Sequence, residues 1–185
     1  SSYVVLSGMA SVVKASGFAF SVTETALANG SNGLALTTAD YSASLSGLDA
    51  IDGTLLINIP GKSDSATVNA ATTYAAGRGN SFVIIDPDPT VTTSSAINAL
   101  VSGYNKTGYG AVYYPMIKAI DPSKSGPAAI RVCYPGGAIA GAFVRSDTER
   151  NIGKTPAGYN VDLRNVLGLG FTPTDAIVTG SYDNG

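Results

Sequence analysis

Residues 54–86 read TLLINIPGKSDSATVNAATTYAAGRGNSFVIID and decide the fold class. Two apolar runs, Thr54 to Ile59 and Ser81 to Ile85, are each closed by a turn that contains proline. Near-continuous apolar runs of this length are typical of strands that are buried on both faces. Residues 64–76 lie between them and favour a helix, so the stretch predicts a strand, a helix and a second strand.

The ends of this helix carry recognisable signals. Ser63 and Asp64 are N-cap candidates, and Gly77 stands where a left-handed residue would end the helix. Towards the C-terminus the alternation continues, with a helix predicted over Thr92 to Tyr104 and a strand over Ala111 to Tyr114. We therefore expect an α/β fold with a mainly parallel sheet and flanking helices, preceded by a small β region.

The remaining segments extend this picture in both directions. The first 36 residues alternate apolar and polar positions with Gly and Asn between them, which indicates strands and turns. Further elements are predicted as helices over Ala39–Asp49 and Gly137–Glu149 and as strands over Met116–Ile120, Ala128–Cys133 and Val166–Phe171. After Phe171 the sequence predicts little regular structure.

Composition excludes several classes of function. The chain has no histidine and a single cysteine, Cys133, which removes histidine-based catalytic triads, histidine-ligated zinc and thiolate metal sites. Cys133 is expected to be a small buried hydrophobic residue. The 185 residues carry a net charge of −2, so the chain lacks the basic surface that binding to nucleic acid requires. No apolar stretch approaches the roughly 20 residues of a membrane span, and we expect no membrane insertion.

The segment Tyr134 to Gly158, YPGGAIAGAFVRSDTERNIGKTPAG, combines a Gly-rich turn, a helix of small residues and a dense charge cluster. It resembles the core of contractile tail sheath proteins of bacteriophages, in which a Pro-Gly or Pro-Ser turn leads into a helix close to GAVAGVYARTDAERG and then into a K-x-P-A-x loop. Other parts are similar to that family in the same order: NGSNGLALTTADY at 29–41, the strand ending in Pro60-Gly61, RGNSFVIID at 78–86 and GAVYYP at 110–115. The resemblance covers about residues 29–161.

The resemblance implies an organisation and a function. Residues 1–36 would be a β-rich segment or part of an inserted or adjacent β domain, residues 37–161 the subtilisin-like α/β sheath core, and residues 162–185 the start of a truncated C-terminal region. The protein would be a virion structural subunit, made in the host bacterial cytoplasm, that polymerises around a tail tube and contracts to drive it through the bacterial envelope. Its partners would be copies of itself, the tube protein and baseplate proteins. It would not be an enzyme, it would need no cofactor or metal, and the fragment alone would be a monomer.

The charge cluster supplies the candidate site residues. Five charges within ten residues are unusual because only 13% of this chain is charged, against ~25% in ordinary soluble domains. Arg145 and Glu149 are four residues apart and could pair on one helix face. The cluster is either a solvated helix end or a salt-bridge network that links subunits or positions a domain. Its members are the subunit-interface candidates Arg145, Asp147, Glu149, Arg150 and Lys154.

The alternative function is a doubly wound nucleotide- or phosphate-binding domain of an enzyme, with ligands near Pro60–Ser63 or Asp86–Thr90. Two segments resemble part of a phosphate loop, Gly61-Lys62-Ser63 and Gly153-Lys154-Thr155, but Leu56 and Thr148 replace the leading glycine that such a loop requires. Both are therefore expected to be turns, the first with a helix cap.

Two further patterns are explained more simply without a catalytic or metal site. Ser11 and Lys14, with Lys106-Thr107-Gly108, match the S-x-x-K and K-T-G pair of penicillin-recognising enzymes, yet Ser11 stands in a β-patterned segment and not at the start of a helix. A metal site or acid/base pair could use carboxylates that stand at strand or helix ends, where capping and turn roles are expected: Asp49, Asp52, Asp86 and Asp88.

Overall fold

The computed structural model describes residues 33–151, 153–158 and 161–182. The chain divides after Ala35, and the account below concerns the unit Leu36–Gly185. The β region predicted over residues 1–36 lies almost wholly outside the described residues, as do Ser11 and Lys14. The described helices and strands are α1 (Thr38–Leu45), η1 (Ser46–Ala50), β1 (Leu55–Asn58), α2 (Ser65–Arg78), β2 (Ser81–Ile85), α3 (Ser94–Ser102), β3 (Gly110–Val112), β4 (Ile117–Ile120), η2 (Gly126–Ala129), β5 (Ile130–Cys133), α4 (Gly136–Glu149), β6 (Val166–Leu169) and α5 (Asp175–Tyr182).

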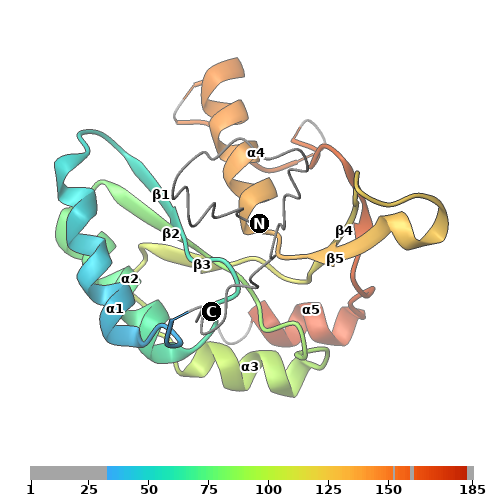
Figure 1. Cartoon of the computed structure of the whole chain (residues 1–185), viewed down its shortest axis with the longest axis horizontal. Coiled ribbons are helices and arrows are strands. Elements are labelled where there is room, and N and C mark those ends of the chain that lie inside the picture. Colours follow the sequence, from blue (N-terminus) through green and yellow to red (C-terminus); the bar gives the residue numbers. More distant parts are fainter. Residues whose placement is uncertain (1–32, 152, 159–160, 183–185) are drawn as a thin grey trace, which may run out of the picture. The chain divides into compact units, whose positions relative to one another are not determined.

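The first sheet is parallel, with strand order β1-β2-β3. Because side chains alternate along β2, Val83 and Ile85 face one layer of helices and Phe82 faces the other. Helices α1 and α2 pack on the first face and α4 on the second (Figure 1). The predicted α/β fold with a parallel sheet and flanking helices is confirmed.

Helix α2 shows why these residues form this layer. Asp64 is its N-cap and accepts a hydrogen bond from the Thr67 N–H at 2.8 Å. Its buried face consists of small and β-branched side chains, which let the helix lie close to the sheet: Thr67, Val68, Ala71, Thr72 and Ala75. Val68, Ala71 and Ala75 from this face join Ile57, Val83 and Ile85 in the hydrophobic core.

The predicted end of α2 at Gly77 is wrong. The helix continues to Arg78, and the left-handed residue is Gly79, with φ of 76°. The guanidinium of Arg78 donates hydrogen bonds to the carbonyl oxygens of Leu48 and Ile51, which ties the last turn to η1 and the segment after it. This tertiary contact extends the helix beyond the first glycine.

The second sheet is antiparallel, with strand order β5-β4-β6. All three of its strands were predicted, and they form a sheet separate from the parallel one. Cys133, at the end of β5, is partly exposed and not buried as expected, because the residues of β5 before it are themselves exposed.

Helix α5 is absent from the sequence prediction. Its residues, DAIVTGSY, include a glycine and β-branched side chains, which are poor helix formers. It forms because the Thr174 carbonyl accepts from the Ile177 and Val178 amides and because the helix packs against α3 (Figure 1). Thr174 followed by Asp175 is the one sequence signal that could have indicated its start.

Candidate functional site: a charged groove beside helix α4

Helix α4 begins at a buried carboxylate that comes from another part of the chain. Pro135, the N-cap, makes no side-chain cap. Instead, Asp86 Oδ1 accepts the Gly136 N–H at 2.8 Å, and the Asp86 side chain is almost fully buried. A carboxylate at this position satisfies a free amide of the helix and interacts favourably with the helix dipole.

Asn58 completes this arrangement. Its Nδ2 donates to Asp86 Oδ2 at 3.2 Å and to the Ile84 carbonyl at 2.8 Å. Asn58 ends β1 and lies beside Ile84 in the parallel register, while Asp86 follows β2 directly. The carboxyl ends of two neighbouring strands therefore bind the first turn of α4.

Gly136 is required by this close approach. A Cβ at Gly136 would lie 2.3 Å from Asn58 Nδ2 and 2.7 Å from Asp86 Oδ1. Gly137 and Gly141 are under no such constraint, because a Cβ at either would meet nothing within 4 Å. The tight contact is confined to the first residue of the helix.

The middle of α4 packs on the sheet through an aromatic cluster. The Phe143 ring stacks on Phe82, with ring centroids 6.0 Å apart, and meets Tyr113 edge-on at 6.4 Å. Ala142 and Ser146 are buried beside it. This packing fixes which face of α4 is turned away from the sheet and presents its charges.

The predicted charge cluster lies at the far end of α4 and in the loop after it. Of its five members, Arg145 is half-buried and the others are exposed: Asp147, Glu149, Arg150 and Lys154. The pairing of Arg145 with Glu149 considered above gives way to other partners. Arg145 Nη2 donates to the Asp162 carbonyl at 2.5 Å, and Glu149 forms an ion pair with Arg164 at 3.6 Å.

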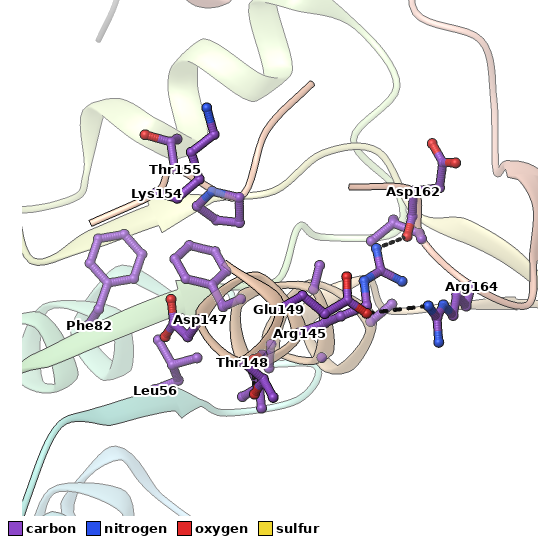
Figure 2. A pocket seen from close by; sticks show the side chains of 18 of the residues that line it. Leu56, Phe82, Arg145, Asp147, Thr148, Glu149, Lys154, Thr155, Asp162 and Arg164 are labelled. Atoms are coloured by element: carbon purple, nitrogen blue, oxygen red, sulfur yellow. Dashed lines mark hydrogen bonds and ion pairs between the residues drawn. The ribbon is translucent and has the colours of Figure 1, made fainter. Parts of the chain in front are cut away.

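These charges surround an open groove of about 1320 Å³. Figure 2 shows Leu56 and Phe82 from the sheet on one side of α4, and Asp162 and Arg164 on the opposite side. Four predicted residues line the groove, and Arg150 is not among its lining residues: the four are Arg145, Asp147, Glu149 and Lys154. The sequence analysis missed Asp162 and Arg164, which stand at the edge of the segment with family resemblance and carry no motif.

The electrostatics of the groove are balanced. Its lining contains three basic residues, Arg145, Lys154 and Arg164, against the three acidic residues Asp147, Glu149 and Asp162. Both partners of the Glu149–Arg164 pair are more than half exposed, so the pair contributes at most about 1 kcal/mol to stability. A surface of alternating charges with an apolar floor is suited to another protein surface of matching pattern and unsuited to a polyanion.

The strand ends considered for a ligand are already occupied by the chain itself. Besides the Asp86 contact with α4, the turn at Gly61 lies against the Tyr134 ring, from which a Cβ at Gly61 would be 3.2 Å. Asp64 is engaged as the cap of α2. Burial acts to raise the pKa of Asp64, but the hydrogen bonds from Thr67 and the charge of Lys62 outweigh it and lower the pKa.

Of the other candidate carboxylates, Asp49 and Asp88 have structural partners and Asp52 is exposed. Asp49 accepts from the Tyr74 hydroxyl at 2.6 Å and lies 3.8 Å from Arg78. Asp88 accepts from the hydroxyl and the amide of Thr90, and these bonds lower the pKa of Asp88. Within the described part of the chain, no three His, Cys, Asp or Glu side chains come together in a way that could hold a metal ion.

No family model matches the chain, and a search of curated proteins finds no match either. Among the described residues, no helix has both the length and the apolar character needed to cross a membrane. The geometry of the chain itself therefore carries the functional argument.

Proposed function

We propose that this chain is the core of a structural subunit of a contractile tail sheath, which polymerises with copies of itself around a tail tube and shortens to drive the tube through a bacterial envelope. The observation that carries the proposal is how helix α4 is held, because α4 lies in the segment with the strongest family resemblance. The start of α4 is bound to the sheet by Asp86, and its charged end lines an open groove. This combination suits a rigid core that presents a polar contact surface.

The proposal has a mechanical consequence. Subunits move as rigid bodies during contraction, sliding and rotating against one another, and the energy is stored in an extended lattice that is less favourable than the contracted one. No nucleotide is consumed in this step, and the subunit has no catalytic role. The partners are other subunits, the tube protein and baseplate proteins, in the virion after synthesis in the bacterial cytoplasm. Neither nucleic acid nor a membrane interior is contacted directly.

Negative-stain electron microscopy of the gene product that carries this chain tests the proposal, with the 185-residue chain as control. We expect striated hollow tubes from the gene product and monomers from the chain alone at micromolar concentration. Persistent monomers from both samples would contradict the sheath function and favour the nucleotide-binding alternative.

Charge reversal in the groove tests the contact surface. Glu149→Lys places a positive charge opposite Arg164, and we expect tubes to be lost while the circular dichroism spectrum and the unfolding midpoint stay close to those of the unmodified protein, because both side chains are exposed. Asp175→Lys is the matched control, since it reverses an exposed acidic residue on α5 that does not line the groove. Normal tubes from Glu149→Lys would exclude the groove as a subunit contact.

A further inference from the structure

The antiparallel sheet exposes an apolar face. In the β4–β5 register, Lys118 is opposite Val132 and Ile120 is opposite Ile130, so these four side chains share one side of the sheet. Ile120, Ile130 and Val132 are 57%, 53% and 55% exposed. These four residues are called the hairpin face below. Adjacent large apolar side chains that remain exposed mark a surface made for contact.

The hairpin is also basic. Residues 117–133 contain Lys118, Lys124 and Arg131 but a single acidic residue, Asp121, an excess of two positive charges in a chain whose net charge is −2. Asp121 pairs with Lys124 at 3.9 Å, and Arg131 is opposite Ala119 in the register and so lies on the other side of the sheet. Lys118 is therefore the cation of the hairpin face, and a partner for this face has to combine apolar side chains with a negative charge opposite Lys118.

The chain itself offers such a surface. Residues 36–53, called the acidic segment below, contain Asp40, Asp49 and Asp52 and no basic residue. Leu36 is 62% exposed and Ile51 is 47% exposed in the same segment. Two cations lie nearby, Arg78 and Lys62. The Arg78 side chain is only 13% exposed, lies 3.8 Å from Asp49 and donates to backbone carbonyls, and Lys62 stands over the Tyr41 ring. Asp40 and Asp52 therefore carry the negative charge that the segment offers to a partner.

We propose that the hairpin face of one copy docks on the acidic segment of a second copy. Contact of two hairpin faces would bring equal positive charges together, and contact of two acidic segments would do the same with negative charges, so both symmetric arrangements are disfavoured. In Figure 1 the hairpin and α1 are well separated, which leaves each surface free to engage a different neighbour. A head-to-tail contact of this kind generates an open helical array. The inference rests on the proposed function in taking the partner to be another copy.

Complementation between charge reversals tests this contact. We would measure the association of the 185-residue chain by sedimentation velocity at high protein concentration, in low salt and again near 1 M salt, where the Debye length falls to about 3 Å. The unmodified chain should associate reversibly in low salt and dissociate in high salt. Lys118→Glu alone and Asp52→Lys alone should each weaken association at least tenfold. An equimolar mixture of the two variants should associate again, because each supplies the surface that the other lacks.

Asp175→Lys is the matched control, since it makes the same change of charge as Asp52→Lys on an exposed residue outside the hairpin face, the acidic segment and the groove, and it should associate like the unmodified chain. The inference is overturned if the chain does not associate in low salt, if the mixture stays as weak as the single variants, or if the hairpin binds DNA or anionic vesicles while copies do not bind one another. Microscopy of the gene product that carries this chain separates the two proposals. Normal tubes carrying Lys118→Glu would contradict this contact alone, whereas complementation without tubes would contradict the sheath function alone.

Discussion

Gly136 is the residue with the least steric freedom in α4. In Gly136→Ala the new methyl group would have to occupy space held by Asn58 and by the carboxylate of Asp86, at distances of 2.3 to 2.7 Å. Neither neighbour can withdraw without losing a hydrogen bond, so we expect the free energy of unfolding to fall by about 2–3 kcal/mol. Urea denaturation followed by circular dichroism measures this loss.

Gly137→Ala is its control, because it lies one residue along the same helix in open space. There the replacement should change the free energy of unfolding by less than about 0.5 kcal/mol or increase it, since alanine is the better helix former. Equal losses in the two variants would show that the first turn of α4 is not held by the contacts described above.

Asp86 supplies the other half of this contact. Asp86→Ala would leave the Gly136 amide and the Asn58 side chain without their acceptor in a buried place, and we expect a loss of about 2–4 kcal/mol. Asp86→Asn keeps an oxygen that can accept from the Gly136 amide but turns an NH2 group towards the NH2 group of Asn58, so it keeps one of the two hydrogen bonds and should lose less. The difference between the two variants, measured by urea denaturation, reports the hydrogen bond to the Gly136 amide. If both variants unfold at the urea concentration of the unmodified chain, Asp86 does not hold α4.

At the scale of elements, the caps of helices and turns give the chain its acid sensitivity. Hydrogen bonds from Thr67 and the charge of Lys62 lower the pKa of Asp64 against the effect of burial, and Asp88 is lowered by Thr90. A carboxylate whose pKa is lower in the folded chain than in the unfolded chain stabilises the fold at pH values above its unfolded pKa of about 3.9. This stabilisation is lost as the pH falls through the pKa of the folded chain. The chain should therefore lose stability as the pH falls from 5 towards 3.

Asp64→Asn isolates the contribution of α2, because asparagine caps a helix without titrating. Asp64→Ala removes the cap and should cost about 1 kcal/mol at pH 7. The unmodified chain should approach the stability of Asp64→Asn as the pH falls below 4, and urea denaturation at a series of pH values checks this. If the gap between the two stays constant from pH 7 to pH 3, the carboxylate of Asp64 has no role in acid sensitivity.

Elements with local signals could be predicted, and those that depend on distant contacts could not. β2 was predicted residue for residue, because an apolar run between Asn80 and Asp86 needs no partner to be recognised. The end of α2 was predicted two residues early, since the contact of Arg78 with η1 is invisible in local sequence. Helix α5 was missed because its stability comes from packing on α3 and not from its own residues.

In the candidate site, too, local signals could be predicted from the sequence and distant contacts could not. The charge cluster at residues 145–154 was visible because charges are scarce in this chain, and four of its members line the groove. Arg164, which pairs with Glu149, was not found because it lies fifteen residues further on, in a segment without a motif. The bond between Asp86 and Gly136 spans 50 residues and was not predicted, although Asp86 had been singled out and Gly136 lies in the segment with the strongest family resemblance.

At the scale of the whole unit, the two candidate functions make opposite demands on the strand ends. A doubly wound nucleotide-binding domain leaves a crevice at the carboxyl ends of its parallel strands. Here the first turn of α4 occupies the ends of β1 and β2, and the amide that a phosphate would seek is bound by Asp86. A ligand would have to displace a carboxylate that is almost fully buried, and this argues for the structural role.

Thermal unfolding in the presence of nucleotides decides between them at this scale. A ligand present at one hundred times its dissociation constant stabilises a protein by about 2.7 kcal/mol. At about 2–4 °C per kcal/mol for a domain near this size, the melting temperature of a true binder would rise by roughly 5–10 °C. For this chain we expect millimolar ATP with Mg²⁺ to shift the melting temperature no more than Mg²⁺ alone does. If a shift of several degrees appears, the variant Lys62→Ala, next to the Gly61 turn, locates the ligand. A shift that disappears in this variant would assign the ligand to the strand ends and reject the sheath function. A shift that persists would assign the ligand to another site and would also reject the sheath function.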